Sequence, residues 1–299
     1  MAATHKITPH LWFDTQAKAA AEFYVDVFPN STIHHLTVLR DTPSGDCDVV
    51  AFELAGQPFQ AISAGPYFAA NPSVSFTVNC ATVAEVNALW ARLSEGGMAL
   101  MPLDAYPFSP RFGWVQDRFG ISWQVSLAEG EREGQPRIVP SLMFTGDNFG
   151  KATEAIGFYT GIFKDAQPGQ IQYNPDAPGP DGAPTVLVAD FLLEGQRFAL
   201  IESGAEHGFT FNEAISFIVS CATQAEIDYY WAHLSAVPEA EQCGWLKDKY
   251  GLSWQITPTA MDAMMRDGTP AQVERVTQTF LPMKKLDIAA IERAYREAA

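Results

Sequence analysis

An internal duplication is the sequence feature that most constrains this fold. The segment Gly-Trp-Val-Gln-Asp-Arg-Phe-Gly-Ile-Ser-Trp-Gln-Val begins at Gly113, and Gly-Trp-Leu-Lys-Asp-Lys-Tyr-Gly-Leu-Ser-Trp-Gln-Ile begins 131 positions later at Gly244. The Phe-Tyr pair that ends at Tyr24 returns as the pair that ends at Tyr159, in the same order along the chain. A repeat of this length predicts two tandem units, because solenoid repeats are much shorter.

Composition and charge narrow the class of protein. The 299 residues are 47% hydrophobic and 18% charged, which is enough for two ordinary cores. The net charge of -16, with no cluster of Lys and Arg, repels phosphate backbones and anionic lipid surfaces. We therefore expect no nucleic acid and no membrane as a partner.

The cellular compartment follows from what the sequence lacks. No run of about 18 apolar residues is present to span a bilayer, and the first residues do not form the apolar stretch of a secretion signal. We expect a cytoplasmic protein. Its four cysteines, which show no CxxC spacing, are then expected to be free thiols: Cys47, Cys80, Cys221 and Cys243.

Hydrophobic periodicity predicts one order of elements that is repeated along the chain. Each unit begins with a strand and a helix followed by three strands, after which the same order starts again. In the first unit these elements are predicted at 8–13, 16–28, 31–40, 49–54 and 57–63, then at 73–79 and 82–93. The last helix and its counterpart start at Thr-x-x-Glu capping boxes, at Thr82 and Thr223. The whole chain thus reads as four βαβββ modules.

These patterns divide the chain into four parts. A first domain covers 1–128, a charged linker with Gly and Pro covers 129–137, a second domain covers 138–258, and a helical extension covers 259–299. Three helices are predicted in the extension, at 259–266, 270–281 and 287–297, and Thr269 with Pro270 forms a start signal for the middle one. The extension has no counterpart after the first domain, so we expect it to dock on a barrel or on a partner chain.

The paired modules, the Phe-Tyr pair and the Gly-Trp-x-x-Asp-x-Phe/Tyr-Gly-x-Ser-Trp-Gln segment resemble the PhnB-like branch of the vicinal oxygen chelate superfamily. That branch is often labelled 3-demethylubiquinone-9 3-methyltransferase. The resemblance implies an α+β fold of tandem domains, each an open curved barrel of two βαβββ modules with outer helices. It implies a small-molecule ligand in the barrel cup. Two-fold pairing is common among oligomers, so the sequence is compatible with a homodimer.

The resemblance also points to particular cup residues. It places the ligand positions of the family at Gln60 and Gln124 in the first domain, and at Ala199 and Gln255 in the second. The restart strand offers Ser73 and Ala214. Metals prefer imidazole and carboxylate to neutral amides, so we expect no metal and no cofactor, with a divalent metal in the first cup as the weaker alternative.

Strand alternation adds two residues to the first cup. Leu11 and Phe13 recur as apolar residues in both units and are expected to face the helices, which turns His10 and Trp12 into the cup. His10 is a candidate general base, and the alternative is a hydrogen-bonding residue without a catalytic role. Gln60 suits a carbonyl or amide ligand, or it satisfies Gln124 across a small cavity.

An insertion in the first domain carries two further candidates. Tyr106 and Arg111 belong to Tyr-Pro-Phe-Ser-Pro-Arg-Phe, and an aromatic loop with one cation over the cup mouth favours an anionic or aromatic ligand. The alternative for Arg111 is a surface salt bridge. Asp117 and Asp248 precede Phe/Tyr-Gly turns, where a carboxylate accepts backbone N–H bonds, so we interpret both as turn residues.

Three functions are compatible with these residues to different degrees. One is an enzyme acting on a small oxygenated metabolite, with His10 as proton acceptor and Gln60 and Gln124 orienting the substrate. The alternative is a binding protein that sequesters an aromatic compound without turnover. An S-adenosylmethionine-dependent methyltransferase is disfavoured, because the chain has no glycine-rich turn between a strand and a helix. We expect the first domain to be the active one.

Overall fold

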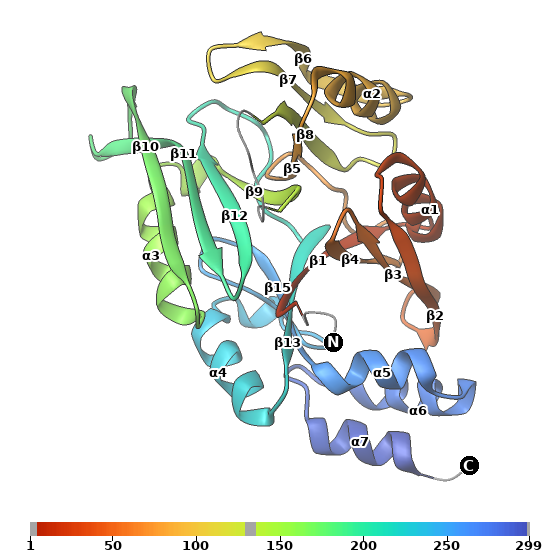
Figure 1. Cartoon of the computed structure of the whole chain (residues 1–299). Helices are drawn as coiled ribbons and strands as arrows, with labels where there is room; N and C mark the ends of the chain where they lie inside the picture. Colours follow the sequence, from red (N-terminus) through yellow and green to blue (C-terminus); the bar gives the residue numbers. More distant parts are fainter. Residues whose placement is uncertain (1–4, 129–135, 298–299) are drawn as a thin grey trace.

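The computed structural model describes residues 5–128 and 136–297, and it contains two mixed β-sheets with helices around them (Figure 1). The first repeat supplies β1 (Ile7–Phe13), α1 (Ala17–Val27), β2 (Thr32–Thr42), β3 (Gly45–Leu54), β4 (Gln57–Ser63), β5 (Val74–Cys80), α2 (Val83–Ser94), β6 (Met98–Tyr106), β7 (Ser109–Gln116) and β8 (Ser122–Leu127). Most of the predicted linker, at residues 129–135, lies outside the described residues.

The second repeat follows the same order with one shortened module. It supplies β9 (Ile138–Phe144), the 3-10 helix η1 (Gly146–Asn148), α3 (Ala152–Ile162), β10 (Gln167–Pro178), β11 (Pro184–Leu193), β12 (Gln196–Glu202), β13 (Ile215–Cys221), α4 (Gln224–Leu234), the 3-10 helix η2 (Pro238–Ala240), β14 (Trp245–Lys247) and β15 (Ser253–Pro258). The extension forms α5 (Thr259–Asp267), α6 (Pro270–Phe280) and α7 (Ile288–Arg296).

Each sheet is assembled from both repeats. Sheet A has the order β14-β15-β13-β1-β4-β3-β2, and sheet B has the order β10-β11-β12-β9-β5-β8-β7-β6. The central contacts are the antiparallel pairs β1–β13 and β5–β9, so the first module of one repeat pairs with the second module of the other. The pairing that the sequence left open is therefore an exchange between repeats. Both sheets are open, with two edge strands each.

The aromatic contacts between the two sheets, in contrast, join residues of one repeat. The ring centroids of Phe59 in sheet A and Phe76 in sheet B are 5.1 Å apart, and both residues belong to the first repeat. Phe198 and Phe217 form the same contact in the second repeat, also at 5.1 Å. Helices α1 and α2 pack on the first of these cores, and α3 and α4 pack on the second. Backbone pairing thus joins the repeats, and the aromatic cores join the two sheets.

The predicted helices are found where the sequence places them. Thr82 accepts the Glu85 N–H and begins α2, while the Glu85 carboxylate accepts the Ala81 N–H instead of closing the capping box on Thr82. Thr269 forms a complete capping box with Gln272 at the start of α6. The fourth module has only β14 and β15 after its helix, because the link from α4 is too short for a hairpin like β6–β7.

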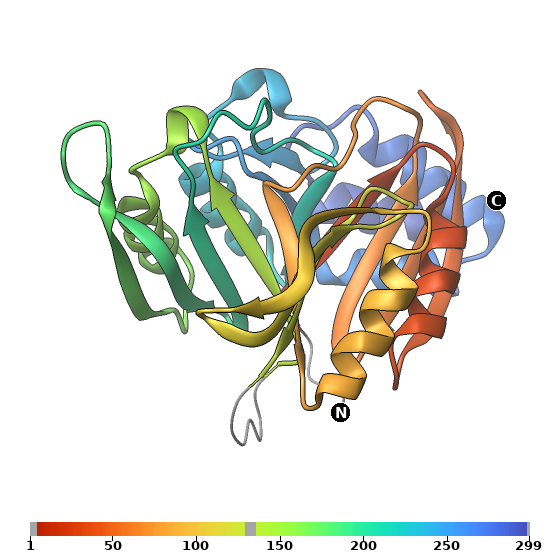
Figure 2. The ribbon, with the colours of Figure 1, turned by 90° about the horizontal axis from the view of Figure 1, so that it is seen from above.

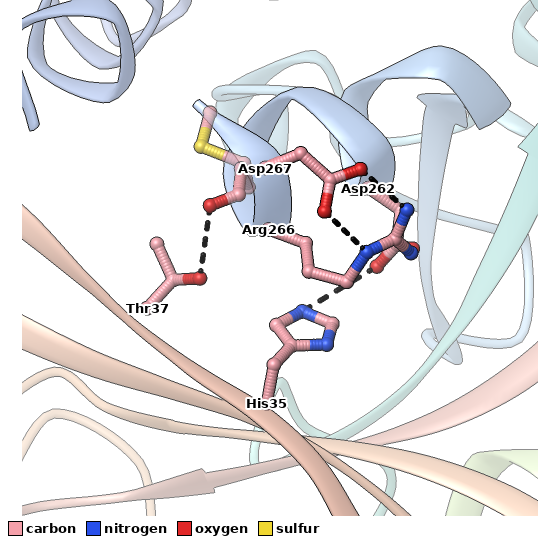
Figure 3. A network of polar contacts seen from close by, with 6 residues as sticks. His35, Thr37, Asp262, Arg266 and Asp267 are labelled. Atoms are coloured by element: carbon pink, nitrogen blue, oxygen red, sulfur yellow. Dashed lines mark hydrogen bonds and ion pairs between the residues drawn. The ribbon is translucent and has the colours of Figure 1, made fainter. Parts of the chain in front are cut away.

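The helical extension docks on sheet A and joins its two edges. Thr37 of β2 donates to the Met265 carbonyl of α5, and His35 lies 3.7 Å from the Asp262 carboxylate (Figure 3). The backbone at Met283 accepts a bond from Cys243, next to β14 at the opposite edge. A view turned by 90° shows these helices beside the strands of the first repeat (Figure 2). The extension thus covers part of sheet A on the face that is turned away from α1.

Candidate functional site

The candidate site lies on the inner face of sheet A, which we define as the face turned away from α1 and α4. Strand register places five residues in one row across four first-repeat strands and β13: His35, Ala51, Gln60, His10 and Ser216. Adjacent strands lie about 4.8 Å apart, so Gln60 and Ser216 flank His10 directly. The predicted assignment of His10 and Trp12 to the inner face agrees with the apolar burial of Leu11 and Phe13 on the helix side.

His10 is buried without a partner for one of its ring nitrogens. The side chain is 2% exposed, and Nδ1 has no hydrogen bond partner among the described residues. The Trp245 ring meets the imidazole edge-on, with centroids 5.3 Å apart. Burial lowers the pKa of His10 to about 3, so the imidazole is neutral at pH 7. An unpartnered buried nitrogen is unfavourable unless a ligand bonds to it.

Neutral polar groups and aromatic rings surround His10. The Gln255 side-chain amide donates to the Ser216 hydroxyl at 3.0 Å, and both residues are buried. The Trp12 indole donates to the Gly65 carbonyl at 2.8 Å, and its ring lies 6.0 Å from that of Trp245. Amide, hydroxyl and indole groups orient a polar, planar molecule by hydrogen bonds and stacking and bring no charge to the site.

Gln124 does not share this site. It lies in β8 of sheet B, where its amide donates to the Ser75 hydroxyl at 2.8 Å. The expectation that Gln124 completes one cup with His10 and Gln60 is therefore wrong, because the exchange between repeats brings Gln255 to sheet A in its place. The restart strands contribute Ser75 and Ser216, each two residues beyond the predicted positions.

Sheet B carries smaller side chains at the positions that correspond to His10 and Gln60. Ser141 occupies the place of His10, between Ser75 and Ala199 in register. Ala199, the predicted second-domain position, lies in β12 in register with Ser141 of β9. A serine and an alanine offer a ligand fewer contacts than an imidazole and an amide, so sheet A is the stronger candidate.

Tyr106 and Arg111 lie on the β6–β7 hairpin at the edge of sheet B. The Arg111 guanidinium donates to the Asn87 side chain of α2 at 2.9 Å, because alternation along β7 turns it toward that helix. The prediction that it overhangs the cup of His10 is wrong, and Asn87 takes the place of the salt-bridge partner. Tyr106 lines a surface cavity of about 500 Å³ with Phe108 and Ser126, away from sheet A.

The repeated Asp is a structural centre in each repeat. Asp117 accepts bonds from the Phe119 and Ile121 backbone, which confirms its role in the turn. Its second oxygen accepts the Tyr24 hydroxyl and the Trp123 indole, both at 2.8 Å. Sequence reasoning missed these two bonds, although all three side chains recur in the second repeat.

The second copy of this centre is equally enclosed. Asp248 accepts the Tyr159 hydroxyl at 2.8 Å and the Trp254 indole at 2.9 Å, and two backbone N–H groups complete its bonding. Burial raises the pKa of Asp248 to about 6, and these donors only partly offset that effect. Each centre fixes the helix of one module to the turn of the next module.

The donor set around His10 suits a metal ion poorly. No group of three or more His, Cys, Asp and Glu side chains that could hold an ion occurs within residues 5–128 and 136–297. The side chains next to His10 are neutral amides and hydroxyls, which do not offset the desolvation of a divalent cation.

Within residues 5–128 and 136–297, no helix has the length and apolar character that crossing a membrane requires.

Comparisons with known proteins agree with this architecture. A family model described as 3-demethylubiquinone-9 3-methyltransferase matches residues 5–126 and 136–257, once per repeat. A solved structure titled putative 3-demethylubiquinone-9 3-methyltransferase, PhnB protein, from Bacillus cereus is 34% identical, with a TM-score of 0.38 over 40% of this chain and 98% of that chain. A search of curated proteins found no match.

A second solved structure spans both repeats. Glyoxalase I from Zea mays aligns with 86% of this chain and 95% of its own, with a TM-score of 0.54 and 11% identity. At that identity the likeness shows the fold alone, which confirms the predicted vicinal oxygen chelate architecture. With a family match to each repeat, the chain belongs to the PhnB-like family described as 3-demethylubiquinone-9 3-methyltransferase, in a two-repeat form.

Proposed function

We propose that this protein binds a small, uncharged, planar oxygenated compound on the inner face of sheet A. The observation that carries this proposal is the buried Nδ1 of His10, which has no partner among the described residues. Gln60 and Ser216 flank this imidazole in register, and the Trp12 and Trp245 rings lie beside it. A planar molecule with a hydroxyl or carbonyl group satisfies the nitrogen and stacks on the Trp12 ring.

Charge favours an uncharged ligand over an anion. His10, with its pKa lowered to about 3 by burial, stays neutral at pH 7. Lys247 follows Trp245 on β14, but its ammonium is paired with the Glu213 carboxylate at 2.8 Å. The protein as a whole carries a net charge of -16, which repels anions at long range.

Binding without turnover is favoured over catalysis by His10. An imidazole whose conjugate acid has a pKa of about 3 is a weak proton acceptor at neutral pH, because the best general bases have pKa values near the working pH. The enzyme hypothesis therefore requires a ligand that restores the basicity of His10. We expect no cofactor and no metal, for the donor set around His10 is neutral.

The methyltransferase activity in the family description is not part of this proposal. S-adenosylmethionine enzymes of the common class use a doubly wound parallel sheet with a glycine-rich turn. Sheets A and B are mixed and have antiparallel pairs at their centres. We expect calorimetry to detect no binding of S-adenosylmethionine, and micromolar binding would contradict this assignment.

The proposal is tested with a matched pair of probes, benzamide and benzoate. Calorimetry and thermal unfolding are expected to detect benzamide binding and no benzoate binding at the same concentration. Loss of the bond to Nδ1 in His10→Ala is expected to weaken benzamide binding about tenfold. Gln255→Ala is expected to weaken it as well, whereas Gln124→Ala, the matched change in sheet B, leaves it unchanged. Tighter binding of benzoate, or equal losses in both glutamine variants, would contradict the proposal.

We propose a homodimer in the cytoplasm, since two-fold pairing is common among oligomers. Sedimentation equilibrium of the full chain distinguishes a 32.7 kDa monomer from a dimer of twice that mass.

A further inference from the structure

The two repeats place the same tryptophan and serine differently. In sheet B the Trp114 indole donates to the Ser122 hydroxyl at 2.7 Å. Trp245 and Ser253 are the corresponding residues of sheet A, and Trp245 faces Gln255 in register as Trp114 faces Gln124. The Ser253 hydroxyl is nevertheless without a hydrogen bond partner in the described part of the chain, although the residue is only 1% exposed.

The residues on β1 account for this difference. Trp245 lies edge-on to His10, with centroids 5.3 Å apart, and 6.0 Å from Trp12. In sheet B the corresponding strand β9 carries Ser141 and Met143, which offer no ring. Trp245 is therefore held by aromatic contacts where Trp114 is held by a hydrogen bond. Two buried polar atoms, Nδ1 of His10 and the hydroxyl of Ser253, are left unpaired beside it.

We propose that Trp245 is the gate of the site, with two orientations of its indole. In the free protein the ring packs on His10, and in the bound protein it turns as Trp114 does and donates to the Ser253 hydroxyl. An edge-on ring contact and a hydrogen bond contribute similar free energies, so a ligand that stacks in place of the indole shifts the balance. Both unpaired buried atoms then gain partners.

The gate selects ligands by their shape. The chemical class of the ligand rests on the proposed function. A flat molecule replaces the edge of Trp245 next to His10, whereas a bulky molecule clashes with Trp12 on the same face. The two orientations themselves depend only on the residues of this chain, so they are testable without any ligand. Trp245 and Ser253 act here as positioning residues.

The ligand-free test copies sheet B into sheet A with the variant His10→Ser. Indole N–H signals of the seven tryptophans are resolved by ¹H–¹⁵N NMR and assigned through Trp→Phe variants, and their exchange with water is measured. We expect His10→Ser to slow exchange of the Trp245 indole hydrogen about tenfold, as one hydrogen bond predicts, and the added change Ser253→Ala to reverse this. Ser122→Ala is the calibration, with exchange at Trp114 about tenfold faster.

Three results would overturn the gate: unchanged exchange at Trp245 in His10→Ser, slower exchange that persists after Ser253→Ala, or unfolding without any slowing in both His10→Ser and a second variant, His10→Ala. Saturating benzamide is expected to slow exchange at Trp245 in the wild type, and Ser253→Ala is expected to weaken benzamide binding severalfold. Binding of benzamide without slower exchange contradicts the gate and leaves the proposed function standing. Slower exchange in His10→Ser with no benzamide binding contradicts only the proposed ligand class.

Discussion

Replacing Tyr159 with Phe removes one of four donors to the buried Asp248 carboxylate, and the expected effect depends on pH. The hydroxyl donates to the carboxylate at 2.8 Å from a side chain that is fully buried. A hydrogen bond to a charged group contributes about 1.5–3 kcal/mol, whereas one between neutral groups contributes about 0.5–1.5 kcal/mol. We therefore expect Tyr159→Phe to lower the free energy of unfolding by about 2 kcal/mol at pH 8 and about 1 kcal/mol at pH 4.5.

The sign of the pH effect follows from the raised pKa. Burial raises the pKa of Asp248 to about 6 in the folded protein, whereas an unfolded aspartate has a pKa of about 4. Between these values only the folded protein holds the proton, so this group stabilises the fold as the pH falls from 7 to 4.5. That stabilisation is lost as the pH rises through 6. Above this pH the Asp248 carboxylate is charged, and its hydrogen bonds then contribute most to the free energy of unfolding.

Urea unfolding at the two pH values measures this difference. Tyr250→Phe is the matched control, because the Tyr250 hydroxyl donates at 2.9 Å to Glu154, whose carboxylate side chain is 59% exposed. Water replaces that bond, so we expect a loss below about 1 kcal/mol at either pH. The reasoning is refuted if Tyr159→Phe destabilises no more than Tyr250→Phe, or if its effect is the same at pH 8 and pH 4.5.

Three further predictions test the packing. Gly113→Ala places a Cβ 2.4 Å from the Trp90 ring, so we expect urea unfolding to show a free energy of unfolding lower by about 1–3 kcal/mol. Gly157→Ala is the control: its Cβ meets open space in α3, and we expect it to stabilise the protein by up to about 1 kcal/mol. Phe280→Ala in the buried cluster of the extension is expected to destabilise by about 3–5 kcal/mol in calorimetry, and no change would contradict the packing of this cluster. The Cys80 thiol, buried and with its pKa raised to about 12, is expected to resist thiol reagents until the protein unfolds.

Local structure was predictable because local chemistry determines it. The hairpin strand was predicted at 57–63 and β4 covers Gln57–Ser63, because a Gly-containing turn and alternating apolar residues fix both ends. The start of α6 was predictable from the Thr269 capping box. All four cysteines are free, as their spacing predicts.

Long-range pairing was not predictable from the sequence. From the sequence pattern alone, β1 has two equivalent candidate partners, β5 of its own repeat and β13 of the other repeat. Both strands carry the same apolar pattern, which ends in Asn-Cys in β5 and in Ser-Cys in β13. Nothing in the pattern of one strand distinguishes two homologous neighbours. The site inherited this ambiguity, since Gln124 was assigned to the face that Gln255 occupies. The Tyr24–Asp117 bond was missed for a different reason, because 93 residues separate its partners.

Because of the exchange between repeats, core residues such as Tyr24 contact partners in their own repeat, whereas site residues such as His10 contact partners in the other repeat. Tyr24 and Asp117 contact each other inside one repeat, so both copies of the repeat need this pair, and both retain it as Tyr159 and Asp248. The inner face of sheet A combines His10 from the first repeat with Trp245 from the second. Residues of one site therefore stand in different repeats, which leaves each repeat free to keep its core while the two inner faces diverge. The serine in place of His10 in sheet B is the outcome that this arrangement allows.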